Sequence, residues 1–130
     1  MSERFSYLRR GDHSIPIADV EISGRSKSLT VKALVDSGAT FSIFREEVAD
    51  FLGIRVEAGR RLYLEGIGGR ILGYLHRLPV RIAGKHFIGK VVFSREFRIS
   101  MNIMGRDNLF DPFSITFKEK EKAVEIRPRS

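Results

Sequence analysis

The residues best suited to chemistry in this chain stand together at Asp36-Ser37-Gly38, directly after an alternating apolar run over residues 29–35. The alternation predicts a strand with one buried face. A carboxyl group at the end of a buried strand lies in a partly dry environment, where its pKa can be tuned for acid–base chemistry. Gly38 allows a sharp turn and leaves room for other backbone. The same three residue types are also common in ordinary turns, so this motif alone leaves both interpretations open.

Two later segments favour the catalytic interpretation. The first runs from Glu65 to Arg70 and contains four residues Gly-Ile-Gly-Gly, and the second is Ile103 to Leu109, which includes Gly-Arg-Asp. These segments, in this order after the aspartate, resemble the retropepsin-like aspartic proteases, the single-domain family typified by the retroviral proteases. The resemblance covers about residues 16–117. It implies an all-β fold, a closed or partly closed β-barrel of the acid-protease type with one or two short helices.

The resemblance also implies a role for each matching residue. The catalytic residue would be Asp36, with Ser37 and Gly38 beside it in the catalytic motif. The glycine-rich hairpin would be a mobile flap with Ile67 at its tip. The positions expected to bind substrate are Ala39, Thr40, Gly66, Ile67, Gly68 and Gly69. The positions expected to support the site are Gly105, Arg106 and Asp107.

Aspartate-catalysed peptide hydrolysis requires a second carboxyl group. Two carboxyls close enough to share a proton cannot both ionise, so one serves as the base and the other as the acid. The chain contains one Asp-Ser-Gly and no other Asp in that context. The second Asp36 must then come from a second copy across a two-fold axis. The resemblance implies that Ser37 hydrogen-bonds across this axis. The predicted function is therefore a homodimeric aspartic endopeptidase that acts on peptide or protein substrates.

The remaining pattern predicts the elements that position these residues. Residues 1–13 are polar and are expected to form a loose, flexible arm, followed by one protease domain over 14–130. Residues 14–22 predict a strand with a bulge or break near Ala18-Asp19, because the apolar phase shifts there. A strand over residues 99–104, a close approach at Gly105 and a short helix are expected next. The other expected strands are residues 62–65, 70–74, 78–82, 87–93, 114–117 and 123–126.

One short amphipathic helix is predicted over residues 44–52. Apolar residues recur there at helical spacing, acidic residues occupy the first turn, and Gly53 is a natural stop. Retroviral members of the family lack a helix at this place, so it points to the non-viral branch. The family's arginine commonly pairs with an acidic residue four positions after the catalytic aspartate. Here that position is Thr40, so Arg106 needs a different partner.

Composition limits the other function classes. The chain has 130 residues, 42% of them hydrophobic, and no cysteine. Its three histidines lack the spacing of a metal site, so neither a metal nor a cofactor is expected. No segment reaches the length of a membrane span, and the amino-terminal residues do not read as a signal peptide, so the expected compartment is the cytoplasm. The net charge is +7 but the basic residues are dispersed, which disfavours nucleic acid as a partner.

Two alternatives remain open. The same fold can serve as a non-catalytic dimerisation or peptide-binding module that clamps an extended segment by strand addition. A basic nucleic-acid binder is the third possibility, and it predicts a steep salt dependence of binding.

Overall fold

The computed structural model describes residues 1–66, 69–98 and 100–129, and β-strands dominate it. The strands are β1 (Glu3–Ser6), β2 (Leu8–Arg10), β3 (His13–Ile15), β4 (Ile17–Ser23), β5 (Ser28–Val35), β6 (Ile43–Phe44), β7 (Arg60–Gly66), β8 (Gly69–Ile82), β9 (Lys85–Phe93), β10 (Asn102–Met104), β11 (Phe113–Lys118) and β12 (Ala123–Pro128). The helices are α1 (Glu46–Leu52) and the 3₁₀ helix η1 (Val56–Ala58). Among the described residues, no helix has the length and apolar character needed to span a bilayer.

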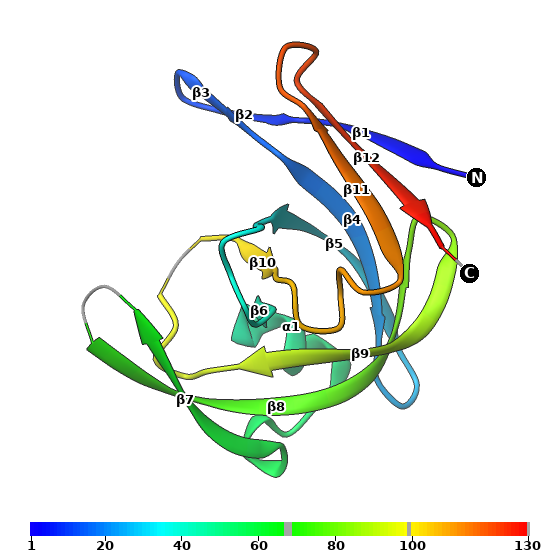
Figure 1. Ribbon diagram of the computed structural model, residues 1–130. Coiled ribbons are helices and arrows are strands. Elements are labelled where there is room, and N and C mark those ends of the chain that lie inside the picture. Colours follow the sequence, from blue (N-terminus) through cyan, green and yellow to red (C-terminus); the bar gives the residue numbers. More distant parts are fainter. Residues whose placement is uncertain (67–68, 99, 130) are drawn as a thin grey trace.

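A seven-stranded sheet forms the body of the molecule. Its order is β4-β5-β10-β6-β9-β8-β7, and an additional pairing of β4 with β8 joins the sheet back on itself. The strands therefore form a ring, although not a regular barrel (Figure 1). The all-β prediction is confirmed, and the predicted strands that lead to Asp36 and flank the glycine-rich hairpin are present as β5, β7 and β8.

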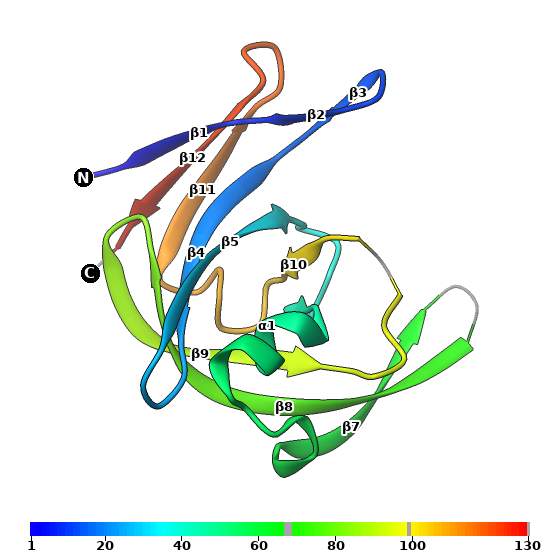
Figure 2. The same cartoon turned by 180° about the vertical axis from the view of Figure 1, so that it is seen from behind.

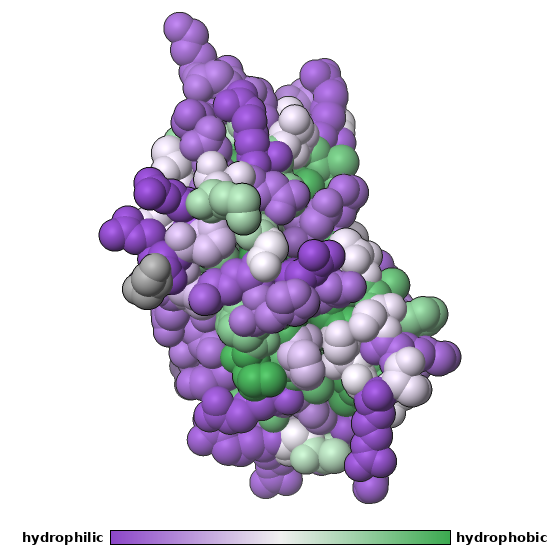
Figure 3. Space-filling view, turned by 90° about the vertical axis from the view of Figure 1, so that its right-hand side faces the viewer, coloured by the Kyte–Doolittle hydropathy of each residue, from purple (hydrophilic) through white to green (hydrophobic). Residues whose placement is uncertain are grey.

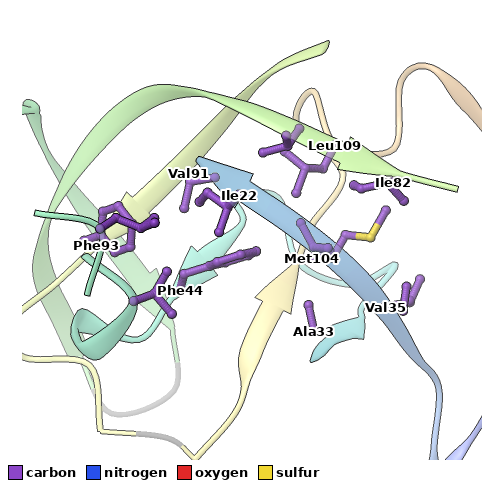
Figure 4. Close-up of a cluster of buried hydrophobic side chains, with 14 of the residues drawn as sticks. Ile22, Ala33, Val35, Phe44, Ile82, Val91, Phe93, Met104 and Leu109 are labelled. Carbon is purple, nitrogen blue, oxygen red and sulfur yellow. The ribbon is translucent and has the colours of Figure 1, made fainter. Parts of the chain in front are cut away.

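The core lies inside this ring. The largest fully buried side chains include Phe44, Phe93, Met104 and Leu109. Figure 4 shows these side chains converging from separate elements together with Ile22 and Val91 from β4 and β9. Because residues far apart in the sequence share this cluster, the core fixes the short strands β6 and β10 relative to the long ones.

Helix α1 forms where the amphipathic pattern predicts it. Glu46 and Glu47 lie in its first turn, where they complement the helix dipole. Gly53 ends it in the left-handed conformation with φ 71°. Val48 and Leu52 face the core, and in Figure 2 the helix lies within the outline of the ring. The predicted helix began at Phe44, but this residue belongs to β6 and is fully buried.

A second, three-stranded sheet has the order β1-β12-β11 and brings the two chain ends to one side of the molecule (Figure 1). Residues 1–13 were expected to form a loose arm, but the structure has strands there. Residues 3–6 pair with β12, and β2 pairs with β3 as a hairpin. The polar composition of this segment does not indicate these strands, because the side chain that anchors β1 in the core is one apolar residue, Phe5, which is 7% exposed.

The interruption expected at Ala18-Asp19 lies earlier in the chain. Strands β4 and β5 pair in continuous register from Ile17 opposite Leu34 to Ser23 opposite Ser28. The chain breaks instead at Pro16, whose missing N–H cannot continue a ladder. The apolar phase shifts because Ala18 is small enough to be buried completely beside Ile17.

The short helix expected after Gly105 is absent. Residues 106–112 form turns, and the expected strand before them begins at Asn102. Asn108 has a φ of 72°, which ends any right-handed helical path. Its side chain accepts a hydrogen bond from the Lys90 backbone N–H at 2.8 Å and so ties the turn to β9. Ile99 lies outside the described residues.

Hydrophilic side chains cover most of the surface seen in Figure 3, and apolar surface appears between them in patches. Most of the ion pairs among the described residues join side chains that are at least one-third exposed, such as Arg81–Glu21 and Arg95–Glu57. Such pairs contribute little to stability individually. Packing inside the ring therefore carries most of the stability of the fold.

Substitution of Phe44 by Ala is expected to lower the free energy of unfolding by about 3–5 kcal/mol, because it leaves a cavity in the middle of the core. Phe51→Ala is the matched control. Phe51 is 47% exposed on α1, so the same substitution should cost less than about 1 kcal/mol. Urea unfolding of both variants measures the difference, and equal losses would contradict this description of the core.

A pH-dependent contact ties the amino-terminal segment to the β11–β12 turn. The Tyr7 hydroxyl donates to Glu119 Oε1 at 3.0 Å. The hydrogen bond from Tyr7, with a further one from Lys122, lowers the pKa of Glu119. Partial burial, together with the same carboxylate, raises the pKa of Tyr7.

The stabilisation from Glu119 is thus complete above the carboxyl's ordinary pKa and is lost as pH falls, whereas that from Tyr7 is complete below pH 10 and is lost above it. Tyr7→Phe is expected to lower the melting temperature most between about pH 5 and pH 9. The difference from the wild type should shrink at about pH 3. A difference that grows on acidification would contradict this assignment.

Candidate active site

Asp36 follows β5 directly, in the turn where the sequence places it. The Asp36 N–H donates to the Met104 carbonyl at 3.0 Å, which extends the parallel pairing of β5 with β10. The Gly38 N–H donates to Asp36 Oδ1 at 3.0 Å, and the Ala39 N–H donates to the Asp36 carbonyl at 3.2 Å. The loop itself therefore orients the partly exposed carboxylate, while Ser37 is exposed beside it.

A second segment holds this loop from behind. The Arg106 N–H donates to the Ala39 carbonyl at 2.9 Å, and the Asp107 N–H donates to the Thr40 carbonyl at 2.7 Å. Gly105, directly before these two residues, is buried. A Cβ atom there would overlap the backbone carbonyl of Phe41, so the close approach requires glycine. The structure thus places the Asp36 loop and the segment around Gly105 against each other, as the resemblance implies.

Two buried polar residues complete the support, and sequence reasoning missed both. Ser42 is 1% exposed and its Oγ accepts a hydrogen bond from the Gly105 N–H at 2.8 Å. Asn102 is 7% exposed, accepts from the Arg45 N–H at 2.8 Å and donates to the Lys32 carbonyl at 3.3 Å. Each stands between apolar neighbours in the sequence. A polar residue in such a run is expected to be buried and hydrogen-bonded, and this signal could have found them.

The supporting arginine acts through its backbone. The Arg106 side chain is exposed, and within residues 1–66, 69–98 and 100–129 it forms no ion pair. Thr40 stands where the family commonly has an acidic residue, and it contacts this segment through its backbone carbonyl. The Asp107 carboxylate lies 3.6 Å from Lys90 Nζ. The support of the loop in this chain thus consists mainly of backbone hydrogen bonds.

The loop opens on a hollow of about 420 Å³ beside the end of β7. Gly38, Ala39 and Thr40 form one wall. The other lining residues, which the sequence did not single out, are Phe41, Ile43, Tyr63, Leu64 and Glu65. The lining combines apolar side chains with polar groups, including one carboxylate, which suits an extended polypeptide that offers both backbone groups and apolar side chains.

The glycine-rich segment connects β7 to β8 as a hairpin in which Gly66 is opposite Gly69. Gly69 has a φ of 115°, a conformation that favours glycine. Two predicted substrate-binding positions, Ile67 and Gly68, lie outside the described residues. Near the base of the hairpin, Leu72 is held on both sides of its backbone: its N–H donates to Glu96 Oε1 at 2.9 Å, and its carbonyl accepts from Ser94 Oγ at 2.5 Å.

In the part of the chain that the structure describes, no three histidine or acidic side chains come together in a group that could hold a metal ion.

Substitution of Gly105 by Ala is expected to lower the free energy of unfolding by at least about 2 kcal/mol, since the added methyl group would push against backbone. Gly66→Ala is the control, because an added Cβ at that hairpin position meets no atom within 4 Å. Thermal and urea unfolding measure both. Equal stability of the two variants would contradict the close approach.

Comparison with known proteins tests the resemblance. A search of curated proteins finds no match. The family model described as aspartyl protease matches residues 18–104, which include Asp36 and the β7–β8 hairpin. The matched stretch is most of the chain and ends one residue before Gly105. The chain therefore belongs to the aspartyl protease family, of the retropepsin-like kind.

Proposed function

We propose that this protein is a homodimeric aspartic endopeptidase, in which the paired Asp36 carboxyls of two copies activate a water molecule. The observation that carries the proposal is the Asp36 loop itself. Its carboxylate is oriented by the Gly38 N–H and the loop is fixed from behind by Arg106 and Asp107. A loop held this firmly by backbone hydrogen bonds suits a reaction that needs its acid and base preorganised.

The dimer follows from the chemistry of a single chain. Asp107 is bonded to the loop through its backbone, but its carboxylate faces Lys90, and Glu65 lines the hollow on the side of β7. A second Asp36 from another copy supplies the missing carboxyl with the same loop geometry. The exposed position of Ser37 beside Asp36 is compatible with a contact across such an axis.

In the proposed reaction the two carboxyls share one proton. The ionised carboxylate removes a proton from the water, which attacks the carbonyl carbon of the scissile bond. The protonated carboxyl donates to the carbonyl oxygen. The tetrahedral intermediate then collapses as the amide nitrogen leaves with the proton that the first carboxylate took from water, while a hydroxyl of the intermediate returns its proton to the second carboxyl. The two apparent pKa values belong to the pair and not to either residue.

The substrate would lie extended against the sheet. Within the described residues β7 pairs with β8 alone, so its other edge presents backbone groups to which a peptide can add. Phe41, Ile43 and Leu64 offer apolar contact beside Gly38 and Ala39. Cleavage between apolar side chains, under a flap formed by the β7–β8 hairpin, is the expected specificity.

Asp36→Asn is expected to lower cleavage of an unfolded protein substrate by at least about a hundredfold, because the substituted pair loses its base. Asp111→Asn is the control, since Asp111 lies exposed in the turns after the site. Cleavage is followed by mass spectrometry between pH 3 and pH 8, and the wild type should give a bell-shaped profile. Sedimentation of the wild type should show a dimer.

Two results would contradict the proposed peptidase function. The first is equal cleavage by the wild type and Asp36→Asn, and the second is a strictly monomeric protein that still cleaves. A wild type that binds an unfolded polypeptide without cutting it would instead favour the non-catalytic peptide-binding module.

A further inference from the structure

A second hollow lies on the outer face of the sheet, where β7 begins beside β8. Its volume is about 580 Å³ and three of its lining side chains are basic. The lining residues are Ala58, Gly59, Arg60, Leu75, His76, Arg77 and Lys90. We call it the basic hollow. In Figure 1 the start of β7 and the adjoining part of β8 lie low in the view, whereas β5, which leads to Asp36, ends near the centre.

The sheet register places like charges against one another there. Arg77 of β8 is directly opposite Lys90 of β9, so both side chains project from the same face. Like charges directly opposite in an antiparallel pair are destabilising. Arg60 stands opposite Leu75 on the neighbouring strand and adds a third cation.

Few carboxylates offset this charge. Among the described residues, the ion pairs of the molecule include neither Arg60 nor Arg77, and Lys90 lies 3.6 Å from Asp107 Oδ1. No acidic residue lines the basic hollow. Lys90 therefore already faces a carboxylate, whereas Arg60 and Arg77 would gain a partner when an anion binds in the basic hollow.

An apolar path connects the basic hollow to the candidate active site. Leu75 lines the basic hollow and also belongs to a buried cluster with Leu64 and Val92. Ile43 packs against that cluster, and both Ile43 and Leu64 line the hollow beside Gly38. Leu64, Leu75 and Val92 are themselves buried, so the accessible apolar surface between the two hollows comes from the partly exposed side chains that pack against them, Phe41, Ile43, Leu62 and Ile71.

The sheet also gives the length of this path. Strand order places β10, β6 and β9 between β5 and β8, so β9 is three and β8 four strand spacings from the strand that delivers Asp36. At about 4.8 Å per spacing, Lys90 and Arg77 are roughly 14–19 Å from the site across the sheet. An extended peptide covers that span in about four to six residues.

We propose that the basic hollow binds acidic side chains of the polypeptide that the enzyme cleaves, at positions about four to six residues from the scissile bond. The inference rests on the proposed peptidase function. The apolar path favours a polypeptide over nucleic acid, because it suits apolar side chains between the cleavage point and the acidic one. The lining also lacks an aromatic residue on which a base could stack, apart from His76, whose Nε2 lies 2.8 Å from the Val56 carbonyl oxygen.

The first test uses paired peptides. One carries Glu and the other Gln at the positions four to six residues from a cleavage point identified in an unfolded protein. The wild type should show about a tenfold higher kcat/KM for the Glu peptide, mainly through KM, and the preference should weaken with salt. Arg77→Gln and Arg60→Gln should reduce the preference to less than about twofold. Arg61→Gln should keep it, since Arg61 projects from the opposite face of the same strand.

The second test measures binding without cleavage. The Asp36→Asn protein, which keeps the basic hollow, should bind a fluorescent Glu peptide about tenfold more tightly than the Gln peptide, and Arg77→Gln in that background should remove the difference. This arm supports the inference even where cleavage fails. Cleavage of both peptides at equal rates by the wild type and Arg77→Gln overturns it and leaves the peptidase function intact. Tighter binding of a single-stranded oligonucleotide than of the Glu peptide, lost in Arg77→Gln, overturns it as well.

Discussion

The close approach of Gly105 to the backbone of Phe41 is the constraint on which the candidate site depends. It allows residues 104–107 to lie flat against the Asp36 loop and to exchange backbone hydrogen bonds with Asp36, Ala39 and Thr40. Any side chain at position 105 would separate the two segments and release those bonds. The buried hydroxyl of Ser42 satisfies the one N–H that this approach would otherwise leave without a partner. The position of the carboxylate is therefore set mainly by backbone, which changes little with the surrounding side chains.

The ring of strands positions the Asp36 loop beside the hollow. The two-residue strand β6 is held between β10 and β9, and its buried Phe44 locks it to the core. Residues 38–41, just before it, and Ile43 of β6 itself then face the end of β7 across the hollow. Rigidity of the core and accessibility of the loop thus come from the same few residues. The inner side chains pack, and the alternate ones open toward the hollow.

A single chain nevertheless leaves the chemistry of an aspartic protease incomplete. The carboxylate of Asp107, whose backbone supports the loop, faces Lys90. The proposed second copy would complete the carboxyl pair, while the basic hollow would extend substrate contact beyond it. In that view the basic side chains of the hollow have a binding role that the other basic residues of the chain lack. Arg77 lies opposite the like charge of Lys90, which faces Asp107, and Arg77 would gain a partner when an acidic side chain binds.

The sequence by itself determined the family, the turn at Asp36-Ser37-Gly38, most strands and the helix that ends at Gly53, because these depend on local patterns of apolar spacing, turn residues and caps. The sequence-based predictions were wrong where a single residue determines whether a strand or helix forms. Phe5 anchors an arm of polar composition, Pro16 breaks a strand two residues before the expected place, and Asn108 ends a helix before it forms. Only the tertiary structure decided the roles of Ser42 and Asn102 and the pairing of Arg77 with Lys90. Those contacts join residues far apart in the chain, and neither spacing nor composition encodes which strands become neighbours.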